Sequence, residues 1–118
     1  DRAFLKLMLE GSGMDDDGRA AVLDRVQTLE DADAALAWYR AADPSDPSGM
    51  GPVATPTLYV WSTEDIALGR AAAELTAAEV EGPYRFEVLE GVSHWVPEEA
   101  ADDLAGLLVD HIGSVAAA

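Results

Sequence analysis

The sequence predicts an α/β fold, and three observations support this prediction. In the first half of the chain, apolar residues recur three or four positions apart, which is typical of helices. In the second half, short β-rich apolar runs alternate with helical segments. A stretch rich in Pro, Gly and Ser separates the two halves. Because the two strands are joined through a helix, we expect them to pair in parallel.

Three helices are expected in the first half, over residues 2–10, 18–29 and 32–42. The first carries one apolar stripe and stops at Gly11. The acidic triplet 15–17 precedes the second helix, where carboxylates favour the positive end of the helix dipole. A metal site is the weaker alternative, because the triplet lacks the spaced ligands of a calcium loop. Asp31 is expected to cap the third helix.

The second half predicts a strand–helix–strand–helix order after the boundary stretch. The expected strands cover residues 55–61 and 84–89, and a helix between them covers 68–80. Pro97 suits the first turn of a final helix, where Glu98 and Glu99 follow it and favour the positive end of the helix dipole. We expect Gly113 to end this helix. The expected organisation is therefore a helical region at 1–43, a linker at 44–53 and an α/β region at 54–118.

Composition excludes several classes of function. The net charge is −16, from 23 acidic and 7 basic residues. Nucleic acids and anionic membranes both attract basic surfaces, so we expect neither as a partner. No apolar run approaches the roughly 18 residues of a membrane-spanning helix. The chain has no cysteine, which excludes disulfides and thiolate metal sites and fits a cytoplasmic location.

Two residues are candidates for acid–base chemistry, because each follows an expected strand. His94 lies on a strand-to-helix loop and could take and return a proton near neutral pH. Asp65 lies on the loop after the first strand. Taken singly, His94 could be a loop histidine bonded to backbone, and Asp65 could cap the following helix. Adjacent parallel strands would bring both to one crevice, where the carboxylate could hold the imidazole Nδ1 proton.

Three stretches carry a family resemblance: PTLYVW at 56–61, EDIALG at 64–69 and EGVSHWVPE at 90–98. They resemble the C-terminal part of an α/β-hydrolase, most closely the epoxide hydrolase and haloalkane dehalogenase branch. In that family the chain order is nucleophile, acid, histidine. The resemblance implies that Asp65 is the acid and His94 the general base. It implies no metal and no organic cofactor.

The helical region resembles the end of the lid that these enzymes insert before their last strands. In this region ALAWYRA at 35–41 resembles a motif of the last lid helix. The resemblance implies that Tyr39 donates a hydrogen bond to an epoxide oxygen; the alternative is an aromatic ring that packs the lid onto the main domain. Trp38, Trp95 and Val96 are expected to line the substrate pocket, or else to pack in the core.

The sequence departs from the family at two serines. Ser62 and Ser93 stand where the family often has Gly. Ser93 also resembles the serine of a G-x-S-x-G elbow, but Trp95 occupies the place of the last Gly. We reject Ser93 as a nucleophile, because the expected base follows it directly in the chain.

No other G-x-S-x-G elbow occurs, so we expect the nucleophile to lie upstream of Asp1. Two strands alone make a marginal sheet. We therefore expect the chain to need the missing N-terminal half of the enzyme, or a second copy of itself, and to be inactive alone. An Asp nucleophile would give epoxide or halide chemistry on a small apolar substrate, and a Ser nucleophile would give ester hydrolysis. A non-catalytic binding module is the third alternative.

Overall fold

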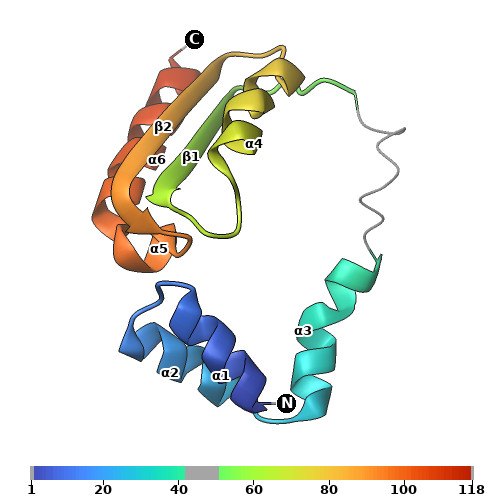
Figure 1. The fold of residues 1–118 in the computed structure, drawn as a ribbon. Helices are drawn as coiled ribbons and strands as arrows, with labels where there is room; N and C mark the ends of the chain where they lie inside the picture. Colours follow the sequence, from blue (N-terminus) through green and yellow to red (C-terminus); the bar gives the residue numbers. More distant parts are fainter. Residues whose placement is uncertain (1, 42–50, 118) are drawn as a thin grey trace. The chain divides into compact units, whose positions relative to one another are not determined.

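The structure is a computed structural model that describes residues 2–41 and 51–117 (Figure 1). The chain divides into two compact units, Asp1–Met50 and Gly51–Ala118. The described part of the first unit is helical, and the second contains two parallel strands with helices between and after them. The predicted α/β class is therefore confirmed. Residues 44–50 of the predicted linker lie outside the described residues.

The first unit contains three helices: α1 (Arg2–Gly11), α2 (Asp16–Arg25) and α3 (Leu29–Ala41). Helix α1 packs against α2, and Leu9 and Met14 are buried there. The Asp15 carboxylate accepts a hydrogen bond of 2.7 Å from the Gly18 N–H at the start of α2. This confirms the capping prediction for the acidic triplet. Within the described ranges, no group of three potential ligands is arranged to hold a metal ion.

The start of α3 corrects one prediction, because Thr28 and not Asp31 precedes the helix. The Thr28 hydroxyl accepts the Asp31 N–H at 3.1 Å, and the Asp31 carboxylate accepts the Thr28 N–H at 2.8 Å. This reciprocal arrangement is a capping box, which satisfies two backbone donors at once. The helix therefore begins three residues earlier than predicted.

The second unit is built on a parallel pair of strands. Its elements are β1 (Thr57–Glu64), α4 (Arg70–Leu75), the 3-10 helix η1 (Thr76–Glu79), β2 (Tyr84–Ser93), α5 (Val96–Glu99) and α6 (Ala101–Ala116). Helices α4 and α6 both contact β1, and α6 runs alongside the two strands (Figure 1). The predicted parallel pairing is confirmed. In the part of the chain that the structure describes, no helix combines the length and apolar character that a bilayer crossing requires.

Several predicted boundaries in this unit are wrong. Both strands end later than predicted, and β1 also begins two residues later than predicted. The predicted helix at 68–80 is a short α-helix followed by a 3-10 turn. The final helix is two helices, which meet at the buried residue Ala100. Gly113 does not end α6, which continues to Ala116. A glycine inside a helix costs only about 1 kcal/mol relative to alanine, so its neighbours can carry the helix past it.

A bulge near the end of β2 sets which residues follow the two strands side by side. Ser62 pairs with Leu89, but Glu64, only two residues later, pairs with Ser93. The two extra residues of β2 are accommodated around Gly91, whose φ is 71° and whose N–H donates to the Thr63 hydroxyl at 2.8 Å. Without the bulge, Asp65 would lie opposite Val92. With the bulge, Glu64 pairs with Ser93, so the residues that follow this pair are Asp65 on one strand and His94 on the other.

Replacing Gly91 by alanine is expected to lower the free energy of unfolding by about 1–2 kcal/mol, because an L-residue at this φ is strained. A Cβ at Gly91 would meet no atom within 4 Å, so strain alone is tested. Gly106→Ala, in α6, also meets open space and is the matched control; it should be stabilising by up to about 1 kcal/mol. Denaturant unfolding measures both values, and equal stabilities would contradict the role assigned to the bulge.

Candidate functional site

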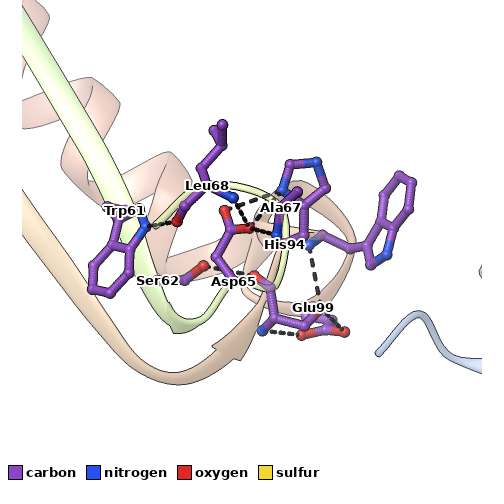
Figure 2. A network of polar contacts seen from close by, with 9 residues as sticks. Trp61, Ser62, Asp65, Ala67, Leu68, His94 and Glu99 are labelled. Carbon is purple, nitrogen blue, oxygen red and sulfur yellow. Dashed lines mark hydrogen bonds and ion pairs between the residues drawn. The ribbon is translucent and has the colours of Figure 1, made fainter. Parts of the chain in front are cut away.

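The structure brings Asp65 and His94 together at the carboxyl ends of β1 and β2 (Figure 2). His94 Nδ1 lies 3.1 Å from Asp65 Oδ1 and 3.0 Å from Oδ2. The Asp65 side chain is 7% exposed and that of His94 is 36% exposed. A carboxylate at this distance favours the imidazole tautomer with its proton on Nδ1. Nε2 is then the nitrogen that can take a proton from a reacting group.

The Asp65 loop is fixed by hydrogen bonds from its own backbone. Asp65 Oδ1 accepts the Ala67 N–H at 2.8 Å and the Leu68 N–H at 2.9 Å. The Leu68 carbonyl in turn accepts the indole N–H of Trp61 at 2.8 Å (Figure 2), and Trp61 is buried on β1. The alternative that Asp65 caps the following helix is wrong, because the residue before α4 is Gly69 and no side chain caps that helix. The Asp65 carboxylate instead binds two N–H groups of its own loop and also faces the imidazole.

The pKa of Asp65 lies below its ordinary value. Burial raises this pKa. The hydrogen bond from the Leu68 N–H lowers it, and so do the hydrogen bonds from His94 and from the Ala67 N–H. The positive charge of a protonated His94 lowers it as well. The lowering effects prevail. Asp65 is therefore a carboxylate at neutral pH and can stabilise an imidazolium that forms during a reaction.

The lowered pKa of Asp65 predicts a stability effect in acid. Because the pKa in the fold is below the unfolded value of about 3.9, ionised Asp65 stabilises the fold above about pH 4. This contribution is lost as the pH falls through the folded-state pKa. The difference in unfolding free energy between wild type and Asp65→Asn should therefore shrink as the pH falls below about 4. Denaturant unfolding across this range measures it, and a difference that does not vary with pH would contradict the prediction.

The His94 loop is held by Glu99, a residue that sequence reasoning did not assign to the site. Glu99 Oε2 accepts the Ser93 N–H at 2.8 Å, and Oε1 accepts the Ser93 hydroxyl at 2.7 Å. The Ser93 hydroxyl also accepts the Trp95 N–H at 3.2 Å. The sequence assigned Glu99 only to the first turn of a helix. No local pattern in the sequence identifies this contact, because a capping box joins a serine to a carboxylate three residues later and Glu99 lies six residues after Ser93.

Ser62 links the end of β1 to the end of β2, next to the Asp65–His94 pair. Its hydroxyl donates to the Ser93 carbonyl at 2.7 Å, and both serines are buried. The Ser93 hydroxyl is occupied by Glu99 and by the Trp95 N–H. A buried hydroxyl that is held in this way is poorly placed to attack a substrate, which agrees with our rejection of Ser93 as a nucleophile.

Comparison with known proteins supports the resemblance predicted from the motifs. Epoxide hydrolase A of Mycobacterium tuberculosis (strain ATCC 25618 / H37Rv) is 27% identical over 82 residues, which cover 65% of this chain and 25% of that protein. Epoxide hydrolase 4 of Mus musculus is 36% identical over 56 residues, which cover 48% of this chain and 16% of that protein. The chain is similar to a segment of an epoxide hydrolase. No family model matches it, and no solved structure matches it significantly.

The epoxide hydrolase-like segment spans a quarter or less of the length of these curated relatives. The matches agree with the predicted resemblance to an α/β-hydrolase of the epoxide hydrolase branch. They agree as well with the described fold, in which two parallel strands lead directly to an acid and a histidine.

A cavity of about 240 Å³ lies beside the acid–histidine pair of this epoxide hydrolase-like segment. Its lining includes Tyr59, Trp61, Asp65, Leu68, His94 and Val96. Val96, which was predicted to contact the substrate, lines this cavity. The ring of Trp95 stands edge-on to the His94 ring at 5.4 Å and 78°. Substrate contacts of Trp95 and Val96 stay predictions.

Tyr39 and Trp38, the other predicted substrate residues, lie on α3 in the first unit. Their rings are 5.1 Å apart at 62°, and each residue is 66% exposed. Packing within the described part of the first unit therefore does not explain why aromatic residues stand at these two positions. Their predicted roles at the substrate stay predictions.

Proposed function

We propose that this segment supplies the acid and the general base of a nucleophile–histidine–acid triad in an α/β-hydrolase, and that the enzyme hydrolyses an epoxide or a similar small apolar substrate. The observation that carries the proposal is the hydrogen bond from His94 Nδ1 to Asp65 at the ends of neighbouring parallel strands. The partial similarity to two epoxide hydrolases supports the choice of substrate class.

In the proposed mechanism, Asp65 holds the Nδ1 proton and leaves the Nε2 lone pair of His94 to act as base. An Asp nucleophile would open the epoxide and form an alkyl ester with the enzyme, and the alkoxide that ring opening leaves would take a proton from solvent. His94 would then take a proton from water, whose oxygen attacks the ester carbonyl and releases the diol. The negative charge of Asp65 stabilises the imidazolium formed in this step. The proton on Nε2 finally leaves to solvent or to the product.

We place the nucleophile outside these residues, in another part of the enzyme. Two observations support this: the sequence holds no complete serine elbow, and Ser93 is buried and hydrogen-bonded. We accordingly propose that the 118-residue chain alone does not turn over substrate.

Tyr39 is proposed to donate its phenol proton in a hydrogen bond to the epoxide oxygen, which gains negative charge as the ring opens. Its exposed ring and the motif around it support this role. Trp38, Trp95 and Val96 are proposed to supply apolar contacts to the substrate, and Val96 already lines the cavity beside the pair.

A parallel assay of the complete enzyme tests the proposal. The substrates are styrene oxide and a p-nitrophenyl ester of similar size, and the matched variant is Asp65→Asn. We expect diol formation from the epoxide, and we expect the variant to lose it. Turnover of the ester alone would overturn the epoxide assignment in favour of a serine esterase. Turnover of neither would favour a non-catalytic binding module.

A further inference from the structure

We propose that Glu99 is a positioning residue that holds His94 in the orientation in which its imidazole meets Asp65. The proposed effect on turnover rests on the hydrolase function proposed above. The proposed effect on the imidazole itself does not, because it depends only on contacts within the second unit.

The contacts of Glu99 lie on both sides of His94 in the chain. Its two carboxylate oxygens accept the N–H and the hydroxyl of Ser93, the residue before the histidine. The same hydroxyl accepts the N–H of Trp95, the residue after it. One carboxylate therefore holds, directly or through one hydroxyl, the backbone on either side of the imidazole (Figure 2).

The contact between Glu99 and Ser93 is itself held in place by hydrogen bonds from both residues. Glu99 is the last residue of α5, and its N–H donates to the Trp95 carbonyl at 2.9 Å, which closes the turn. At the other end, the Ser93 carbonyl accepts the Ser62 hydroxyl from β1, the strand that leads to Asp65. The position of His94 relative to Asp65 is thus set by a chain of hydrogen bonds from α5 to β1.

The chemistry of this contact favours a carboxylate. Ionised, it offers two acceptor oxygens and no donor, and it meets two donors on Ser93. Hydrogen bonds to a charged acceptor are also stronger than neutral ones. Glutamine has the same length but only one acceptor oxygen and no charge, so the Ser93 hydroxyl would have to turn and accept from the amide N–H₂. The charge-assisted bond from this hydroxyl would be lost, and the His94 loop should be held less firmly.

A small displacement of the imidazole has a large kinetic effect, because a misplacement of about 1 Å can cost on the order of 10²-fold in rate. We therefore expect Glu99→Gln to lower kcat of the complete enzyme by about tenfold or more and to change KM little. Glu98→Gln removes the same charge from an exposed neighbour on α5 and is the matched control. It should leave kcat unchanged.

The direct readout is the tautomer of neutral His94 in ¹⁵N NMR of the complete protein, with the signal assigned by its loss in His94→Gln. We expect the Nδ1–H tautomer to dominate in wild type and in Glu98→Gln. In Glu99→Gln we expect a mixture of both tautomers, because the bond to Asp65 is weakened. An unchanged imidazole signal together with unchanged kcat would overturn the role of Glu99.

A double-mutant cycle separates positioning from general support of the loop. If Glu99 acts through the pair, Glu99→Gln should cost little in an Asp65→Asn background, where the imidazole has already lost its carboxylate. An equal loss in both backgrounds would overturn the proposal. If Glu99→Gln does not fold by circular dichroism, Ser93→Ala is measured in its place. It removes the hydroxyl bond but keeps the Ser93 N–H bond, and it is judged by the same readouts.

The readouts also distinguish this proposal from the proposed function. A tautomer change in Glu99→Gln without any hydrolase activity in wild type would support positioning and refute the hydrolase. Hydrolase activity in wild type, with neither readout changed in the variant, would refute positioning and leave the hydrolase standing.

Discussion

Replacing His94 by glutamine is expected to lower kcat of the complete enzyme by about 10²- to 10⁴-fold, the range that a positioned general base contributes. The reason is that Nε2 of His94 is the group proposed to activate the hydrolytic water. With an Asp nucleophile, ester formation should still proceed, so the covalent intermediate accumulates. Steady-state kinetics measures the loss, and intact mass after mixing with an epoxide measures an adduct of the substrate mass.

His111→Gln is the control for this experiment. It replaces the second histidine of the chain, which lies on α6 and not at a strand end. We expect it to leave turnover unchanged. Undiminished turnover in the His94 variant would remove this histidine from the mechanism.

Replacing Asp65 by asparagine is expected to cost about 10²- to 10⁴-fold in kcat, because an amide can neither hold the Nδ1 proton with its charge nor stabilise the imidazolium. Asparagine keeps the size of the side chain and one oxygen that can accept the Ala67 and Leu68 N–H groups. The loop should therefore stay folded while the charge is lost. Steady-state kinetics and a thermal melt measure the two effects separately.

Glu64→Gln is the matched control for the acid. Glu64 is the neighbouring carboxylate, and it is exposed at the end of β1. We expect it to have little effect on turnover. A larger loss in Glu64→Gln than in Asp65→Asn would show that the wrong carboxylate has been assigned.

The central pair could be predicted from sequence because it depends on topology more than on detail. Two apolar runs with a helix between them predict parallel strands, and parallel strands bring the residues that follow them to one edge of the sheet. The predicted strand ends were too early, at residues 61 and 89. The contact between Asp65 and His94 forms nevertheless, because β1 ends directly before Asp65 and β2 ends directly before His94.

The features that set the fine geometry could not be predicted in the same way. The bulge at Gly91 depends on a hydrogen bond to Thr63 on another strand. The local alternation of apolar and polar residues does not indicate such a contact. Glu99 was assigned to a helix dipole because its bonds to Ser93 exist only once the loop is folded. Gly113 was read as a helix stop, although only a positive φ would make glycine necessary, and Gly113 is not among the glycines with positive φ.

The most direct test of the account is the kcat of the Asp65→Asn, His94→Gln double variant beside the two single variants in the complete enzyme. Groups that act as one catalytic unit lose their effects non-additively. We predict that the double variant is no slower than the slower single variant. Losses that multiply, or single variants that retain full activity, would contradict the claim that the Asp65 carboxylate works through the His94 imidazole.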